Sequence, residues 1–172
     1  MSKAPPKTAK PGTQPVYQNK PLQAHVEDSY KSRGKLGNGT LCPKCGAVFH
    51  DGRWRWLPRP EQAHEEVCPA CHRIADGVAA GYVRLEGEFL AQHREEILKL
   101  VGHVELKEKA EHPLQRIMNI VDEDGAVLVT TTDTHLAQGI GEAIHHAYQG
   151  HLELKFGDSE NLIRVHWQRP LR

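Results

Sequence analysis

The chain is poor in aromatic residues and has no long apolar segment. Its 172 residues include three Phe, three Trp and four Tyr, and apolar residues make up 38% of the total. A large aromatic core is therefore not expected, and a small core usually needs an additional cross-link. No apolar run approaches the roughly 20 residues that a membrane-spanning helix requires. We therefore expect no membrane partner.

The first 21 residues lack the features of an export signal. They contain lysines and prolines without an apolar stretch, which is typical of an extended, flexible arm. We therefore expect a cytoplasmic protein. In that reducing compartment, cysteine pairs favour metal or redox chemistry over structural disulfides.

The common motifs of catalysis are also missing. The sequence contains no phosphate-binding glycine-lysine loop, no G-x-S-x-G and no H-E-x-x-H. The polar run Thr130–Asp133 is explained by the end of a strand and the cap of a helix. These absences predict a protein that is not an enzyme, and we identify no small-molecule substrate.

The net charge of zero conceals an uneven distribution. Residues 1–60 contain eleven Lys or Arg and three acidic residues, whereas the remainder contains eleven basic and nineteen acidic residues. Such an asymmetry suggests that the front half meets a polyanion. The simpler alternative is a solubilising tail.

We predict an α+β fold: a four-cysteine zinc ribbon followed by a long helix and a ββαββ antiparallel-sheet module. The predicted parts are a basic arm with a short helix (1–38), the zinc ribbon (39–84), a connecting helix (85–113) and the ββαββ module (114–169). In the arm, Leu22, Val26 and Tyr30 form one apolar stripe.

Local patterns support these assignments. Asp51-Gly52 predicts a hairpin turn, and Pro113 ends a segment with apolar residues at helical spacing. A second predicted helix begins at Asp133 or Thr134 and ends at Gly150. Gly139 and Gly141 lie inside that helix, where a close approach to the sheet would explain them.

The four cysteines form two C-x-x-C pairs. Cys42 and Cys45 are followed after 22 residues by Cys68 and Cys71, and we predict a tight turn at each pair. Two such pairs on either side of a hairpin are typical of a zinc ribbon, in which each pair supplies two thiolates to one tetrahedral ion. We therefore predict Zn²⁺ at these four residues, in a closed structural site.

Other chemistries fit parts of this pattern. Cys68, Cys71 and His72 form C-x-x-C-H, the attachment motif of c-type haem, but haem attachment requires export and leaves the first pair unexplained. An iron–sulfur cluster also suits four thiolates, and a dithiol redox switch is a further alternative. His50, His64 or His72 could replace or supplement a ligand.

Basic residues surround the predicted ribbon. In the run RWRW, strand alternation places Arg53 and Arg55 on one face and Trp54 and Trp56 on the other. The tryptophans either cover the metal site or stack on unpaired bases. Arginine and lysine suit phosphate, so the predicted nucleic-acid contacts are Lys31, Arg33, Lys35, Lys44, Arg53, Arg55 and Arg59.

The segments LCPKCGAVFHDGRW and CPACHRIADGVAAGYVRLEGEFL, with VLVTTTDTHLAQGIGEAIHHAYQG further on, resemble a small bacterial family of zinc-ribbon proteins. That family is described as related to the export adaptor of the large ribosomal subunit, the nonsense-mediated-decay protein three. The resemblance covers roughly residues 22–168. It implies that the four cysteines bind metal and that the partner is a ribosome or RNA. This chain is much shorter than the adaptor, so its export role is not implied.

Three functions remain open. The first is a non-enzymatic RNA- or ribosome-binding protein, associated with ribosomes or with stress. The second is an adaptor that binds only protein, through His145, His146 and Tyr148 on the second helix. The third is a thiol redox switch at Cys68 and Cys71.

Overall fold

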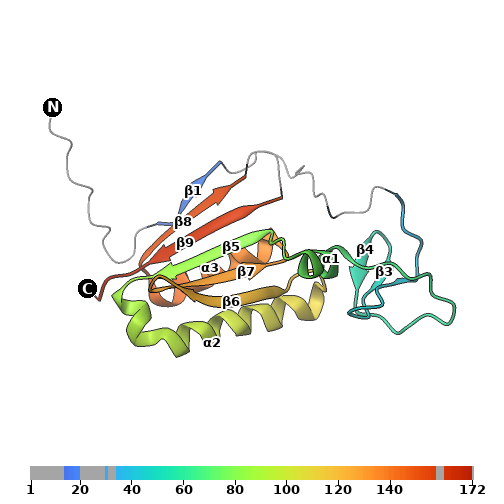
Figure 1. Ribbon diagram of the computed structural model, residues 1–172, viewed down its shortest axis with the longest axis horizontal. Helices are drawn as coiled ribbons and strands as arrows, with labels where there is room; N and C mark the ends of the chain where they lie inside the picture. The colour runs from blue at the N-terminus through green and yellow to red at the C-terminus, as the bar shows by residue number, and fades with distance from the viewer. Residues whose placement is uncertain (1–13, 20–29, 31–33, 158–160, 172) are drawn as a thin grey trace.

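The computed structural model describes residues 14–19, 30, 34–157 and 161–171. Within these ranges the chain forms three helices, a six-stranded mixed sheet and a separate three-stranded sheet (Figure 1). The α+β class predicted from the sequence is confirmed. Leu22 and Val26, which belong to the short helix predicted in the arm, lie outside the described residues.

The small sheet contains β2 (Thr40–Leu41), β3 (Val48–His50) and β4 (Arg53–Arg55), paired antiparallel in this order. β3 and β4 form the hairpin predicted from Asp51-Gly52, whose φ angles are 48° and 84°. A two-residue turn of this kind needs left-handed backbone at both positions, which Asp tolerates and Gly adopts freely. The small sheet lies at one end of the molecule, beside the short helix α1 (Pro69–Asp76) (Figure 1).

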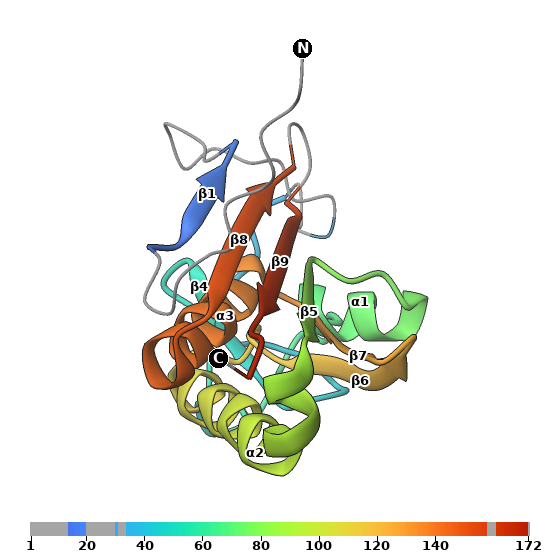
Figure 2. The ribbon, with the colours of Figure 1, turned by 90° about the vertical axis from the view of Figure 1, so that its left-hand side faces the viewer.

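The large sheet has the strand order β1-β8-β9-β5-β7-β6. Its strands are β1 (Val16–Gln18), β5 (Gly81–Glu86), β6 (Ile117–Glu123), β7 (Ala126–Thr131), β8 (His151–Phe156) and β9 (Ile163–Gln168). Figure 2 shows β1, β8 and β9 side by side at one edge. From β6 to β9, with helix α3 (Thr134–Tyr148) between the two hairpins, the elements follow the predicted order ββαββ.

The prediction of an antiparallel sheet is wrong, because the large sheet is mixed. β5 pairs parallel with β9 and antiparallel with β7, and β1 is parallel to β8. The prediction assigns residues 81–84 to the ribbon and Leu85 to the helix, whereas all of them belong to β5. Helix α2 (Glu88–Glu111) begins only after Gly87. Because β5 reaches β9 through several intervening elements, no hairpin dictates an antiparallel pairing.

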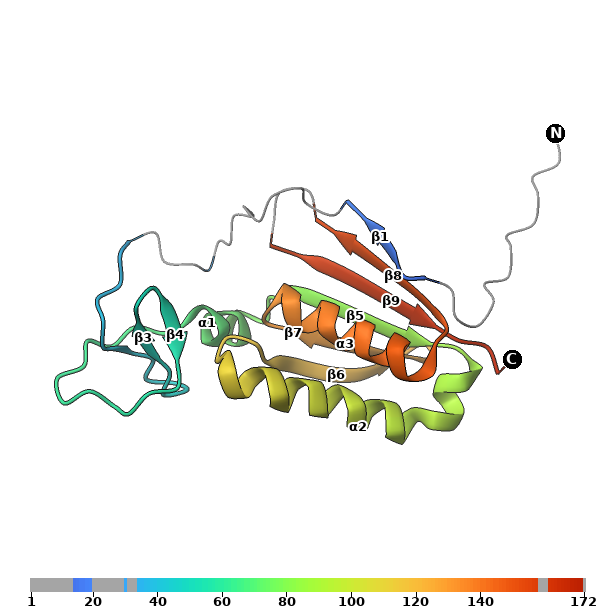
Figure 3. The ribbon, with the colours of Figure 1, turned by 180° about the vertical axis from the view of Figure 1, so that it is seen from behind.

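The main core lies on one face of the large sheet, where α2 and α3 pack beside each other (Figure 3). Val83 and Leu85 of β5, with Val165 and Trp167 of β9, point toward the helices and are at most 2% exposed. Strand alternation turns residues such as Arg84 to the opposite face, where they are partly exposed.

Gly141 lies where α3 closely approaches β8 and β9. A Cβ atom there would lie 2.5 Å from Val165 Cγ1 and 3.1 Å from Leu152 Cδ1. The close approach expected for the two helix glycines is therefore confirmed for Gly141. It does not apply to Gly139, where a Cβ atom would meet no atom within 4 Å.

We expect Gly141→Ala to lower the free energy of unfolding by about 1–3 kcal/mol, because overpacking forces the helix away from β8 and β9. Gly139→Ala is the matched control and should stabilise the protein by up to ~1 kcal/mol, since Ala is the better helix former. Urea unfolding followed by circular dichroism measures both values. Equal effects of the two substitutions would contradict the packing assigned to Gly141.

Candidate metal centre

The first cysteine pair lies in a tight turn between β2 and β3. The Gly46 amide donates to the Cys42 carbonyl at 2.9 Å, and the Cys42 amide donates to the Ala47 carbonyl at 2.8 Å. Gly46 has a φ of 81°, a conformation that favours glycine. This turn brings the sulfurs of Cys42 and Cys45 to the same side of the chain.

The second pair begins helix α1, whereas the sequence predicts a second cysteine turn. Cys68 is the N-cap, and its sulfur accepts a hydrogen bond from the Cys71 amide at 3.4 Å. Pro69 occupies the first turn and Gly77 ends the helix with a φ of 68°. Both are recognised signals for a helix start and stop, so they could have predicted α1. A helix N-terminus also favours the thiolate form of cysteine.

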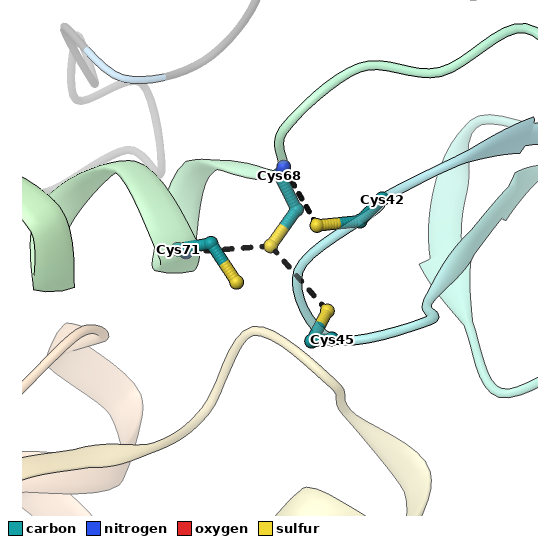
Figure 4. A group of neighbouring side chains, drawn as sticks. All are labelled: Cys42, Cys45, Cys68 and Cys71. Atoms are coloured by element: carbon teal, nitrogen blue, oxygen red, sulfur yellow. Dashed lines mark hydrogen bonds between the residues drawn. The ribbon is translucent and has the colours of Figure 1, made fainter.

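The four sulfurs converge between these two segments (Figure 4). All four Sγ atoms lie within 4.8 Å of one another, and Cys45 Sγ and Cys68 Sγ are 3.8 Å apart. Thiolates bound tetrahedrally at about 2.3 Å from an ion are separated by about 3.8 Å. The Cys68 amide donates to Cys42 Sγ at 3.3 Å, which connects the two pairs directly.

The donor set fits a tetrahedral metal ion. The four cysteines are free rather than disulfide-bonded, and Cys42 and Cys68 are fully buried. Among the described residues, no histidine belongs to this group of ligand atoms. His50 instead lies 3.3 Å from the carboxylate of Asp51. A set of four thiolates closes the coordination shell and is typical of a structural metal.

Arg116 supplies positive charge to the cluster from a distant part of the chain. Its Nη2 atom donates to Cys68 Sγ at 3.3 Å and to Cys71 Sγ at 3.2 Å. The backbone of Arg116 is held at the start of β6, because its amide donates to Thr132 Oγ1 at 3.0 Å. Sequence reasoning missed this residue, since no local pattern connects it with cysteines more than 40 residues away.

The thiols of the cluster influence one another strongly. A hydrogen bond from Cys68, with further help from Cys42 and Arg116, lowers the pKa of Cys45 to about 5. The pKa of Cys68 is raised, because its thiol donates to Cys45 and is buried. Burial also raises the pKa of Cys71. Several thiolates this close together repel one another, so full ionisation requires a cation among them.

Trp54 covers the cluster as part of a small core. It is 8% exposed, meets Phe49 edge to face at 5.6 Å between ring centroids, and belongs to the apolar group around the buried cysteines. Of the two roles considered for the tryptophans, Trp54 therefore takes the covering role. Trp56 is 39% exposed, and its Nε1 donates to the Lys109 carbonyl at the end of α2 at 2.6 Å.

The predicted basic contacts that the structure describes lie in different surroundings. Lys35 and Arg53 line the same cavity beside the metal centre. Lys44 is exposed in the first cysteine turn, and Arg55 is half-buried. Arg59 lies 3.6 Å from the carboxylate of Glu65. Lys31 and Arg33 lie outside the described residues.

The charge asymmetry of the chain arises largely outside residues 34–80, the small unit that contains the cysteine cluster. Residues 34–80 contain six Lys or Arg and five acidic residues, whereas residues 1–33 contain six basic and two acidic residues. The positive charge of the front half is therefore concentrated in residues 1–33 of the arm. Around the metal centre, individual cations matter more than the total charge.

No family model, no curated protein and no solved structure matches this chain. The resemblance to the zinc-ribbon family related to the ribosomal export adaptor therefore stays a prediction. No helix in the described part of the chain combines the length and apolarity needed to cross a bilayer.

We expect one divalent metal ion per chain and a loss of metal on replacement of Cys68 by Ser. A strong chelator should make all four thiols reactive and residues 36–80 sensitive to protease, because the small core depends on the metal. Metal analysis, thiol titration and limited proteolysis measure these effects. A metal-free protein with protected thiols would contradict this site.

We expect Arg116→Met to weaken metal binding by about 10–100-fold, the range typical of groups that hydrogen-bond to metal ligands. Loss of the guanidinium leaves the thiolate charges of Cys68 and Cys71 less compensated. The control is Arg94→Met, which removes an exposed ion pair with Asp122. Competition with a chromogenic chelator measures the affinity. Equal affinities in the two variants would rule out this role for Arg116.

Proposed function

We propose that this chain is a non-enzymatic zinc protein that binds RNA, either free or within the ribosome. Zinc suits four thiolates in a tetrahedral set, and such a closed site leaves no coordination position for a substrate. The metal then fixes the hairpin β3–β4 against α1, as a zinc ribbon would. We place the protein in the cytosol, where zinc–thiolate sites persist in preference to disulfides.

The observation that carries this proposal is the position of Lys35 and Arg53. Both side chains line an apolar cavity that also contains Trp54 and Phe49, next to the metal centre. Among the described residues, neither cation has a carboxylate partner. Cations beside aromatic side chains suit unpaired RNA, whose phosphates need positive charge and whose bases stack on rings.

The sequence of the arm also supports binding to RNA. Residues 1–33 contain six Lys or Arg, among them Lys31 and Arg33. A basic segment next to a folded RNA-binding unit increases affinity through additional phosphate contacts. The resemblance to a zinc-ribbon family related to the export adaptor of the large ribosomal subunit agrees with this proposal.

The experiment compares Lys35→Ala/Arg53→Ala with the wild-type chain in binding a single-stranded RNA and purified ribosomes across a salt series. We expect at least tenfold weaker binding to the RNA at about 50 mM salt and a slope of log K against log salt that is smaller by about 1.4, since each phosphate contact contributes about 0.7 on single strands. Fluorescence anisotropy and cosedimentation are the measurements.

The control is Lys99→Ala/Lys107→Ala, which removes the same charge from the exposed surface of α2. It should bind nearly as well as the wild type. Absence of RNA and ribosome binding at low salt would refute the proposal. Recovery of a protein partner after complete nuclease digestion would favour the protein-only adaptor instead.

A further inference from the structure

The cavity beside the metal centre has the size of a small-molecule site. Its volume is about 760 Å³, within the range of roughly 300–1,000 Å³ that ligand pockets occupy. Its walls come from residues 34–38, the hairpin β3–β4, the segment before α1, and Leu114. A metal bound by the four cysteines would therefore also hold in place the parts of the wall that come from the hairpin and from the segment before α1.

Rings and aliphatic side chains form most of the lining. Phe49 and Trp54 come from the hairpin, and Tyr30 lies on another wall. Tyr30 is held by a hydrogen bond from its hydroxyl to Asp76 at 3.0 Å and by the Arg73 guanidinium, 4.4 Å from its ring centroid. Leu36 and Val67 add apolar surface. A flat aromatic ligand suits such a lining, because it can pack against side chains such as Phe49 and Tyr30 and bury its apolar surface.

Glu66 gives the cavity a specific hydrogen-bonding preference. Its backbone is fixed by a hydrogen bond from its amide to the Leu41 carbonyl at 3.0 Å. Its side chain lines the cavity and is partly buried, and in the described part of the chain its carboxylate has no hydrogen-bond or ion-pair partner. An ionised carboxylate only accepts hydrogen bonds, so at this point the cavity favours a ligand that presents N–H groups.

The nucleobases differ in what they can offer a carboxylate. Guanine presents two adjacent donors on its Watson–Crick edge, the N1–H and N2–H₂ groups, which match the two oxygens of one carboxylate. Adenine and cytosine each place an acceptor next to their single amino group. Uracil flanks its one N–H with two carbonyl oxygens, which a carboxylate repels. Glu66 therefore favours guanine.

Lys35 and Arg53 provide positive charge for the phosphate of a bound nucleotide. Lys35 and Arg53 line the same cavity as Glu66, and their positive charges attract the phosphate that a carboxylate would repel. A nucleotide thus finds donors, an acceptor and aromatic surface in one place.

We infer that this cavity binds one unpaired guanine nucleotide of RNA, with the base between the aromatic side chains, its Watson–Crick edge on Glu66 and its phosphate near Lys35 and Arg53. This inference rests on the proposed RNA-binding function and assigns that function a base preference. Because the metal holds the walls of the cavity, removal of the metal should abolish the preference.

The test uses the full metal-loaded chain and three RNA pentamers, UUGUU, UUAUU and UUUUU, with affinity measured by calorimetry. UUGUU should bind about 5- to 160-fold more tightly than the other two, since a bidentate contact to the correct base contributes about 1–3 kcal/mol of discrimination. Glu66→Gln should remove that preference without weakening the binding of UUUUU.

The matched control is Glu65→Gln, which alters the adjacent acidic residue, whose carboxylate lies near Arg59. It should keep the full preference for UUGUU. Val67→Phe gives a second test, because the larger ring fills the cavity while Lys35 and Arg53 remain. This variant should bind all three pentamers about equally. Metal content and circular dichroism confirm that each variant is folded.

The outcomes separate the two proposals. Salt-dependent binding of all three pentamers with equal affinity would overturn the guanine site and leave the RNA-binding function intact. Absence of binding to every pentamer and to ribosomes would overturn both. Binding of guanosine monophosphate without binding of RNA would overturn the assignment to RNA and show that the cavity takes a free nucleotide.

Discussion

The convergence of four sulfurs is the constraint on which the rest of the small unit, residues 34–80, depends. Its core contains few large side chains around Trp54 and the cysteines, and a core of this size rarely folds without a cross-link. A metal ion bound by the four sulfurs would join the turn after β2 to the N-terminus of α1. Arg116 extends this connection to the large sheet by its hydrogen bonds to Cys68 and Cys71.

The same constraint creates the surface that we regard as functional. The hairpin contributes Phe49, Trp54 and Arg53 to one side of the cavity, and the segment entering α1 contributes Glu66. Neither segment could form this cavity alone. A metal with four protein ligands takes no part in binding chemistry, so its contribution to function is the relative position of these two segments.

Prediction from sequence succeeded where the relevant contacts are local. The Asp51-Gly52 turn, the helices α2 and α3 and the order of strands from β6 to β9 follow from turn residues, caps and alternation within a few positions. Prediction failed for β5, because its neighbours β9 and β7 are distant in the chain and pairing direction is not encoded in a single strand. The helical N-terminus at Cys68 had local signals in Pro69 and Gly77, but the cysteine spacing suggested a turn.

The sequence by itself determined that two pairs of thiols would meet, since the C-x-x-C spacing places both sulfurs of a pair on one side of the chain. It also determined the amphipathic helices and the hairpins. Only the tertiary structure decided that Arg116 neutralises the thiolates, that Arg59 lies near Glu65, and that Lys35, Arg53 and Glu66 share one cavity. Most of these contacts join residues far apart in sequence, and their positions depend on how the small unit packs against the sheet, which no local pattern specifies.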